Sequence, residues 1–551
     1  MNTRIWRVST LGLALLLAAC DSSESARDAG GRDDGGSLPG ERVAVNPAES
    51  TAAQVVSPAF LSFAVDIIAV VGGEAADPDS DQNIVFPPYD FDRPKLRRLV
   101  QALLDGKPAY MRISGTQIDQ TYFDMSDTPV AQPPPNYKRV LTRAQWDKAN
   151  AFARALGLEI FIGINAGPGP RDALYNWVPD NARDFLRYTA EQQYPVTAIE
   201  FGNEPNVFYG AHAGQILPTY TALSYARDIR AFEALRQELL PGATFVGPGP
   251  FLTSRDPRGE QPISVRGVTV SLGAPDPGPA LDAVGAPLGP ESWQVMPLVQ
   301  NIYGAVNYHY YPVFSGRCVF NPKLPEDPLQ PAFLDSHLEN HAYMSGLRDQ
   351  WNAGAPLWLG ETGSAACGGA VDYSDRHIAT FYYLNHLGQL AQRGVQVYVR
   401  QALEGGTYGL LQQNSLEPNP DYWASLLWRR LMGRQQLTLD VPQAPQTLRV
   451  YAACTPGRPG AVTLLALNLS RDTPVNLELQ GPGAGAAQVY TVTAPSLDAR
   501  QIALNGRTLT APEGVVPRLD PVIASSGVVT LPAAAYAFVV QDAAAQVCLG
   551  G

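Results

Sequence analysis

Two glutamates stand in local sequences that suit catalysis by a pair of carboxyl groups. Glu204 lies in the run Gly-Asn-Glu-Pro-Asn at residues 202–206, and Glu361 lies in the run Gly-Glu-Thr at residues 360–362. Each run follows a short apolar stretch, so we expect each glutamate at the end of a buried strand. A protonated carboxyl group can protonate a leaving oxygen while an ionised one attacks the adjoining carbon, and together they perform glycoside hydrolysis.

The elements that would position these glutamates alternate between short apolar strands and amphipathic helices. Eight strands are predicted at residues 60–65, 110–113, 159–164, 198–201, 244–247, 305–309, 357–360 and 395–400. Apolar residues three and four positions apart predict helices at residues 95–104, 143–156, 182–194 and 220–239. Eight alternations in one block favour an α/β fold of the (β/α)8 TIM barrel type over a doubly wound sheet.

Polar residues follow most of the predicted strands, which is where a TIM barrel carries its chemistry. Glu204 follows the fourth strand and Glu361 ends the seventh, so we expect them to face each other across the barrel mouth. A single glutamate at a strand end is more often a salt-bridge partner, but the coincidence of both positions is more specific. The other strand ends carry Asp66, Ser114, Thr116, Asn165, His309, Tyr310, Tyr311, Arg400 and Gln401.

The C-terminal part of the chain has a different pattern, with strands and turns only. Strands are predicted at residues 448–452, 462–468, 475–479, 487–493 and 535–541, which indicates a β-sandwich that residues 42–56 could extend. A chain of 551 residues has room for a barrel and such a second domain. We therefore predict a signal peptide at 1–19, a flexible tether with a possible first sandwich strand at 20–55, the catalytic barrel at 56–434 and the sandwich at 435–551.

The first twenty residues indicate export. Arg4 and Arg7 precede an apolar run at residues 8–19, which is too short to span a bilayer. The run ends in Leu-Ala-Ala-Cys, similar to a bacterial lipobox, in which the cysteine, here Cys20, becomes the lipidated first residue. The alternative is an ordinary signal peptide with a chance cysteine, but the Ser-, Gly- and Asp-rich residues 21–40 favour a tether. We expect a protein anchored by lipid alone to a bacterial membrane, on its periplasmic or cell-surface side.

Four further cysteines remain, an even number that suggests two disulfides in an exported chain. Three pairings are possible. Cys454 and Cys548 lie in one C-terminal block, so we expect them to pair with each other and to leave Cys318 for Cys367. No Cys/His spacing resembles a zinc site, and the six histidines argue against a metal enzyme, so we expect neither metal nor cofactor.

Overall charge restricts the partners. The 40 Lys and Arg residues against 52 Asp and Glu residues give a net charge of −12. A nucleic-acid-binding protein needs a basic surface, so we expect no nucleic-acid partner. The same charge weakens the case for a densely sulfated polyanion as substrate, although local basic patches are compatible with it.

The residues around both glutamates resemble motifs of the heparanase family of retaining β-glycosidases. Residues 200–206, Glu-Phe-Gly-Asn-Glu-Pro-Asn, resemble its acid/base motif. Residues 359–365, Leu-Gly-Glu-Thr-Gly-Ser-Ala, resemble its nucleophile motif, and the match continues with gaps from about residue 60 to residue 548. The resemblance implies that Glu204 is the acid/base and Glu361 the nucleophile.

The same resemblance implies roles for residues at other strand ends. Asn203 would hydrogen-bond the sugar 2-hydroxyl group. Asp66 and Thr116 would contact hydroxyl groups or position the acid/base. His309 and Tyr311 match a His-Tyr-Tyr run of the family after strand six, in which the tyrosine lies near the nucleophile. Core packing is the competing interpretation for Tyr311.

A second group of residues would recognise the sugar and its charge. Gln401 matches a sugar-contacting glutamine. Gly368, Gly369 and Tyr408 match a group that holds a uronic acid carboxylate through backbone N–H groups and a phenol. The family usually has an aromatic residue just before the glycine pair, whereas this chain has Ala-Cys at 366–367. A plain turn is the competing interpretation for the glycines, and core packing for Tyr408.

These observations favour a β-glucuronidase, exo- or endo-acting, whose partner is an oligo- or polysaccharide that contains glucuronic acid. A retaining β-glycosidase for a neutral sugar is one alternative, and Tyr408 with the glycine pair argues against it. A non-catalytic carbohydrate-binding surface lipoprotein is another, and the presence of Glu204, Glu361 and Asn203 argues against it. Residues 119–144 are short and proline-rich where vertebrate heparanases carry a long excised linker, so the chain should act as one uncut polypeptide.

Two long predicted loops bear on the cleavage mode. Residues 253–291 follow strand five and are rich in Gly and Pro, and residues 312–334 follow strand six and contain Cys318. If both wall off one end of the cleft, only a terminal sugar can enter, which is exo cleavage. The net charge agrees, because it repels a sulfated chain within the Debye length of about 8 Å. The competing interpretation is that both loops fold away from the cleft.

The lipid anchor leads to a first testable prediction. Replacing Cys20 by alanine removes the thiol that would be acylated, so the variant should leave the membrane fraction and become free. The measurement is the distribution of the protein between membrane and soluble fractions after cell lysis. A variant that stays with the membrane would contradict the lipobox interpretation.

Overall fold

The computed structural model describes residues 40–77, 80, 82–211, 216, 220–253, 263–265, 268–270, 289–318 and 326–549. These residues belong to one compact unit, 39–551. None of the helices in this part of the chain is both long and apolar enough to cross a membrane. The predicted signal peptide, Cys20 and most of the predicted loop at 253–291 lie outside the described residues.

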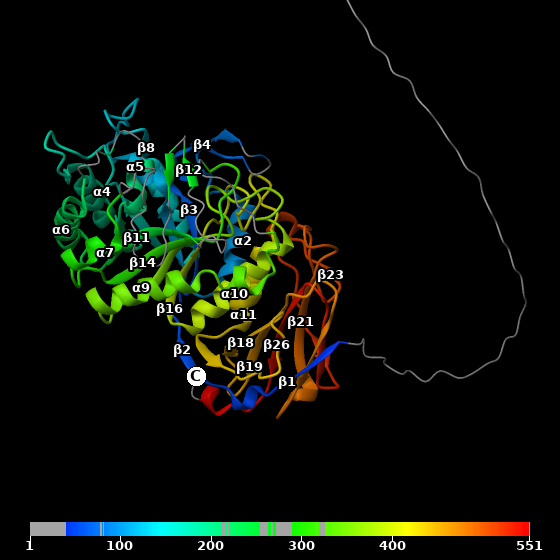
Figure 1. The fold of residues 1–551 in the computed structure, drawn as a ribbon. Coiled ribbons are helices and arrows are strands. Elements are labelled where there is room, and N and C mark those ends of the chain that lie inside the picture. The colour runs from blue at the N-terminus through cyan, green and yellow to red at the C-terminus, as the bar shows by residue number, and fades with distance from the viewer. Residues whose placement is uncertain are drawn as a thin grey trace, which may run out of the picture. The chain divides into compact units, whose positions relative to one another are not determined.

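Eight parallel strands form the predicted closed barrel (Figure 1). In chain order they are β3 (Leu61–Asp66), β6 (Tyr110–Ser114), β9 (Glu159–Ile164), β10 (Val196–Phe201), β11 (Thr244–Thr253), β14 (Ala305–Tyr311), β15 (Leu357–Thr362) and β16 (Val395–Arg400). Each strand pairs with the next, and β16 pairs with β3 to close the ring. The fold class predicted from the sequence is therefore confirmed.

The barrel interior is filled by side chains that alternate with outward-facing ones. Trp358 of β15 packs against Tyr110 of β6 and Phe161 of β9, with ring centroids 5.1 and 5.9 Å apart. Because β15 neighbours neither strand, these rings must meet across the interior. In β16, Val397 and Val399 join this inner cluster while the outward Tyr398 packs in the outer core. The apolar floor leaves the opposite, C-terminal ends of the strands for polar residues.

The four predicted helices are present as α2, α3, α4 and α6, and further helices flank the other barrel strands. The longer ones are α2 (Pro94–Leu104), α3 (Arg143–Leu156), α4 (Asp180–Glu191), α6 (Ala222–Leu239), α9 (Leu338–Trp351), α10 (His377–Gln392) and α11 (Pro420–Leu431), and the short ones are α1 (Ile67–Val71), α5 (Phe208–Ala211), α7 (Ser292–Val295) and α8 (Pro331–Leu334). The predicted bounds of α3 are confirmed, and capping residues define both of its ends. Thr142 and Gln145 form a capping box, and Gly157 ends the helix in the left-handed region.

Two further sheets follow the barrel in sequence and include two strands that precede it. The larger contains β2 (Thr51–Val55), β17 (Gln435–Thr438), β18 (Leu448–Cys454), β19 (Val462–Asn468), β26 (Ala535–Gln541), β21 (Ala487–Thr493), β22 (Ala503–Leu504), β23 (Arg507–Thr508) and β24 (Val522–Ala524). The smaller contains β1 (Glu41–Val45), β20 (Val475–Leu479) and β25 (Val528–Leu531). Figure 1 shows β1 and β2, in blue, beside these yellow to red strands. The domain boundary at 434/435 stays a prediction.

Short two-stranded ribbons complete the described part of the chain. They are β4 (Gly73–Ala76) with β5 (Asn83–Phe86), β7 (Thr121–Asp124) with β8 (Arg139–Thr142), and β12 (Ile263–Val265) with β13 (Val268–Val270). The first ribbon lies between β3 and α2 in sequence and the second between β6 and α3, so both are insertions after barrel strands.

The central strands of the larger sheet are buried on both faces. In β19, Leu464 and Ala466 pack into the core shared with the smaller sheet, while Leu465 packs into the core shared with the barrel helices. Tyr451 of β18 lies against Gly388 of α10, where a Cβ atom would approach the ring to within 2.4 Å. Double burial explains why these strands read as unbroken apolar runs instead of alternating ones.

Both predicted disulfides are present. Cys318–Cys367 joins the segment after β14 to the segment after β15, with Cα atoms 5.5 Å apart. Cys454–Cys548 joins the end of β18 to the C-terminal segment, with Cα atoms 5.4 Å apart. The first cross-link therefore fixes two loops on the side of the barrel that carries Glu361.

The second disulfide leads to a prediction about stability. Replacing Cys454 and Cys548 together by serine should lower the free energy of unfolding by about 2–4 kcal/mol, because the unfolded chain regains the entropy that the link removed. The measurement is the thermal unfolding midpoint of the double variant against the intact protein, without reductant. Equal midpoints would show that this link contributes no stability.

Candidate active site

Glu204 and Glu361 converge at the C-terminal end of the barrel. Glu204 follows β10 in a left-handed backbone conformation with φ of 55°, and Glu361 lies within β15. A carboxyl oxygen from each, together with a ring nitrogen of His309, lies within 4.8 Å of the other two atoms. Both side chains are buried, with exposures of 9% and 7%. The predicted pair of facing carboxyl groups is thus brought together.

Arg112 of β6 lies beneath the pair and links it to a third glutamate. Its Nη1 donates to Glu361 Oε2 at 2.6 Å, and its Nη2 donates to Asn203 Oδ1 at 2.8 Å. Its Nε and Nη2 donate to Glu200 Oε1 at 3.0 and 2.6 Å. The guanidinium group is fully buried, and it supplies the positive charge that a cation would otherwise bring to these carboxylates.

Arg112 and Glu200 are site residues that the sequence reasoning missed. Each is a charged residue in the middle of an apolar strand, and such residues are almost never buried without a partner. Ser114 Oγ and Asn307 Nδ2 also donate to Glu200, at 2.5 and 3.4 Å. The signal was present in the sequence as two isolated charges of opposite sign, although nothing there paired them with each other.

The surroundings of Glu361 favour its ionised form. Burial is the largest single effect and raises the pKa of this carboxyl group, but the Arg112 charge, His309 and hydrogen bonds together lower it more. One of these bonds comes from the Tyr311 hydroxyl, which donates to Glu361 Oε1 at 2.7 Å. The net result is a pKa below the usual range, so Glu361 stays a carboxylate.

Glu204 has the opposite electrostatic surroundings. Burial, and next the negative charge of Glu361, raise the pKa of Glu204 well above its usual value. His309 Nδ1 lies 3.0 Å from Glu204 Oε1, and burial together with Arg112 lowers the pKa of His309 to about 4. His309 is therefore neutral at neutral pH. Arg112 Nη2, which can only donate, lies 3.4 Å from Nε2, which favours a proton on Nδ1 directed at Glu204.

Asp66 and Gln401 lie at the same mouth, as predicted. Asp66 ends β3 and hydrogen-bonds Gln401. Burial, and next the charge of Glu361, raise the pKa of Asp66 to about 7. Thr116 begins a 3-10 turn directly after Gly115, and a Cβ atom on Gly115 would lie 2.4 Å from a carboxyl oxygen of Asp66. The buried Asp66 carboxyl group therefore gains or loses its proton near neutral pH.

Tyr408 and the glycine pair lie together beside the nucleophile. The Tyr311 and Tyr408 rings stack with centroids 6.5 Å apart, and Gln401 Nε2 donates to the Tyr408 hydroxyl at 3.4 Å. Gly369 has φ of 82°, and a Cβ atom there would lie 2.6 Å from Tyr408 N, so glycine is required at this position. Gly368 has φ of 85°. The contact joins two residues, Gly369 and Tyr408, whose roles were predicted from the same resemblance.

Asp119 is a further residue that the sequence reasoning did not identify. It lies in the 3-10 turn after β6 and accepts the Asn203 N–H on Oδ2 and the Ala166 N–H on Oδ1, each at 2.8 Å. Burial is the largest cause that raises its pKa to about 7. Asp119 thus connects the turn after β9 to the turn that carries Asn203 and Glu204. No local pattern marks this aspartate as different from a surface one.

Comparisons with known proteins agree with this geometry. A family model described as "Glycosyl hydrolase family 79, N-terminal domain" matches residues 90–254 and 292–388. Heparanase of Gallus gallus is 33% identical over 427 residues, which cover 74% of this chain and 73% of that protein. Baicalin-beta-D-glucuronidase of Scutellaria baicalensis is 28% identical over 388 residues, or 69% of each chain.

A solved structure extends the likeness of fold. The crystal structure of a 4-O-alpha-L-rhamnosyl-beta-D-glucuronidase from Fusarium oxysporum 12S matches 91% of this chain and 99% of that one, with a TM-score of 0.60 at 19% identity. This chain spans 65% of the length of two heparanase-like proteins of Arabidopsis thaliana. Taken with the identity to the avian heparanase, these matches establish that the chain belongs to the heparanase and β-glucuronidase family, glycoside hydrolase family 79.

Proposed function

We propose that this glycosidase is a retaining β-glucuronidase in which Glu361 is the nucleophile and Glu204 the acid/base. The observation that carries the proposal is the short separation of the two carboxyl groups combined with their opposite pKa shifts. Retaining enzymes hold the two groups about 5–5.5 Å apart, whereas inverting enzymes need about 6.5–9.5 Å for an intervening water. A carboxyl oxygen of Glu204 within 4.8 Å of one of Glu361 supports the shorter, retaining separation.

The proposed reaction has two displacement steps. Glu361 attacks the anomeric carbon while Glu204 protonates the glycosidic oxygen, so the glycosidic bond breaks and a glycosyl ester forms on Glu361. Glu204, now ionised, removes a proton from water, which attacks the anomeric carbon and releases Glu361. Arg112 and Tyr311 hold the Glu361 carboxylate through both steps by donating to one oxygen each.

The substrate proposal rests on the residues beside the nucleophile. Tyr408 packs against Gly369 and stacks on Tyr311, which bonds the proposed nucleophile, and its phenol can donate a hydrogen bond to a carboxylate, so we assign it with the glycine pair to the carboxylate of glucuronic acid. The names of two relatives, a heparanase and a β-D-glucuronidase, agree with a uronic acid substrate. Export, the lipid anchor at Cys20 and an exo mode of cleavage stay proposals of the same kind.

Substitution of the nucleophile tests the assignment. Glu361→Gln removes the attacking charge without changing the size of the side chain, so kcat on an aryl β-glucuronide should fall by about four orders of magnitude or more. A 2-fluoro-glucuronide with a good leaving group should label Glu361 in the intact protein, as peptide mass mapping would detect. The matched control is Glu339→Gln, an exposed glutamate on α9, which should keep full activity.

Two outcomes would contradict this proposal. A covalent label on any residue other than Glu361 would reject the nucleophile. An aryl β-glucoside hydrolysed faster than the aryl β-glucuronide would reject the uronic acid substrate while leaving the catalytic pair intact. The two parts of the proposal are thus tested separately.

The pH dependence provides a second test. Activity needs Glu361 ionised and Glu204 protonated, so kcat/KM should fall on the acid side as Glu361 gains a proton and on the alkaline side as Glu204 loses one. Because the pKa of Glu361 is lowered and that of Glu204 raised, the active range should extend beyond both usual carboxyl values. Glu204→Gln should abolish the alkaline fall on a substrate with a good leaving group, since glutamine does not titrate.

The control for this profile is Asp66→Asn, which should retain the alkaline fall at reduced activity. If the fall persists in Glu204→Gln and disappears in Asp66→Asn, the titrating acid is Asp66, whose pKa is about 7. That result would overturn the assignment of Glu204 as the acid.

A further inference from the structure

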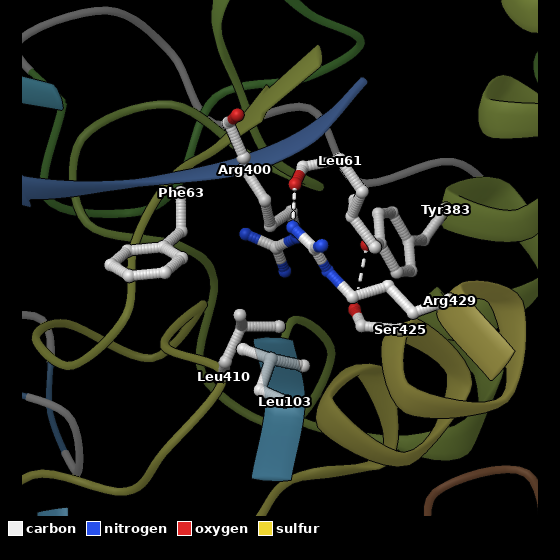
Figure 2. Close-up of a pocket in the computed structure, with 9 residues that line it drawn as sticks. Leu61, Phe63, Leu103, Tyr383, Arg400, Leu410, Ser425 and Arg429 are labelled. Atoms are coloured by element: carbon white, nitrogen blue, oxygen red, sulfur yellow. Dashed lines mark hydrogen bonds between the residues drawn. The ribbon is translucent and has the colours of Figure 1, made fainter. Parts of the chain in front are cut away.

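A small cavity lies behind the barrel wall, between β3 and β16 on one side and α2, α10 and α11 on the other. Its volume is about 10 Å³, enough for a single water-sized occupant. Figure 2 shows that the side chains of Arg400 and Arg429 both point into it, among Phe63, Leu103 and Leu410. The exposures of the two arginines are 2% and 5%, so two guanidinium groups share one buried space.

The two arginines differ in how their charges are neutralised. Arg400 Nη2 donates to Asp421 Oδ2 at 2.7 Å, and Thr380 Oγ1 fixes the other oxygen of Asp421 at 2.8 Å. Arg429 donates only to carbonyl oxygens among the described residues, those of Leu61, Leu104 and Pro108. Within this part of the chain no carboxylate forms an ion pair with Arg429. Its charge is therefore buried without a counterion.

The surrounding elements do not correct this imbalance. Arg430 of α11 already pairs with Asp105, at 3.4 Å. Lys107 Nζ donates a hydrogen bond to the Arg429 carbonyl oxygen and adds a further positive charge. The two nearby carboxylates are thus taken, Asp421 by Arg400 and Asp105 by Arg430, and neither forms an ion pair with Arg429. An arginine cannot lose its proton to escape burial, so an uncompensated guanidinium is costly.

The hydrogen-bond donors at the cavity point to the charge of the occupant. The Tyr383 hydroxyl pairs with Ser425 Oγ at 2.7 Å, and Ser425 Oγ donates to the Asp421 carbonyl at 2.7 Å, so both hydroxyl groups are used. Arg429 Nε is buried and has no hydrogen-bond partner among the described residues. The hydrogen-bond donor that remains for an occupant of the cavity is the Nε–H of Arg429. A water molecule could accept from it, but only an anion also offsets the excess positive charge.

We propose that this cavity binds one small monatomic anion, chloride, between Arg400 and Arg429. The anion would cross-link β16 to α11, because the two arginines belong to these two elements. Arg400 Nη1 also donates to the Gln401 carbonyl, so the bound anion would support the segment that carries Gln401 into the candidate active site. The proposal does not depend on the proposed substrate, because none of the residues that line the cavity hydrogen-bonds Glu204 or Glu361.

Anion exchange on the intact protein tests the proposal. The thermal unfolding midpoint is measured at constant ionic strength while sodium gluconate, whose anion is too large for the cavity, is replaced stepwise by sodium chloride. Chloride should raise the midpoint saturably, by about 1–3 °C at saturation. Arg429→Lys keeps the charge but lacks Nε, and it should weaken this dependence at least tenfold in chloride concentration. The matched control Arg430→Lys, on the same helix, should respond to chloride as the intact protein does.

A diffraction experiment keeps the proposal falsifiable if the variant does not fold. Crystals of the intact protein grown in sodium bromide should give an anomalous peak between the guanidinium groups of Arg400 and Arg429. No peak there, or equal midpoints in gluconate and chloride, would mean that the cavity holds water and would overturn the proposal.

Discussion

The buried guanidinium group of Arg112 is the interaction on which the candidate site depends. Glu200, Glu204 and Glu361 lie in one enclosed space, where three carboxylates would repel each other and protonate. Arg112 bonds directly to two of them and leaves the third, Glu204, without such a partner. Arg112 thus helps to keep Glu361 ionised while Glu204 stays protonated, and this difference is what double displacement requires. Removing it would leave buried charge uncompensated, which usually destabilises a fold strongly.

The scaffold holds this arrangement by separating two kinds of interior. Trp358 and its neighbours fill the lower part of the barrel with apolar contacts, so the polar network occupies only the end where the strands stop. The loops at that end are fixed by covalent and polar links. Cys318–Cys367 joins two of them, and the Asp119 carboxylate joins two more by accepting one backbone N–H from each. Rigid loops matter because small displacements of paired carboxyl groups change the reaction that they can perform.

The sequence predicts the barrel well because apolar periodicity is a local property, and Glu204 and Glu361 are recognised because strand ends are where a barrel acts. The sequence does not predict the Arg112 network. Arg112 and Glu361 are 249 positions apart, and the local sequence around each gives no indication of the other. Asp119 is missed because its partners are backbone N–H groups, which almost every residue has. The pairing of Cys454 with Cys548 is predictable because both belong to one block of strands. The contact of Gly369 with Tyr408 required a family resemblance, as periodicity says nothing about it.

The double burial of β19 and β26 has a consequence for how such a protein can be altered. Leu465 of β19 and Phe538 of β26 belong to the same core as the barrel helices, while Leu464 and Val539 belong to the core of the smaller sheet. A recombinant fragment that ends at α11 would expose a large apolar surface to water and would aggregate. The barrel and the sheets that follow it therefore cannot be exchanged between relatives as independent domains. Gene fusions, truncations and chimeras have to keep the barrel and these sheets together as one unit.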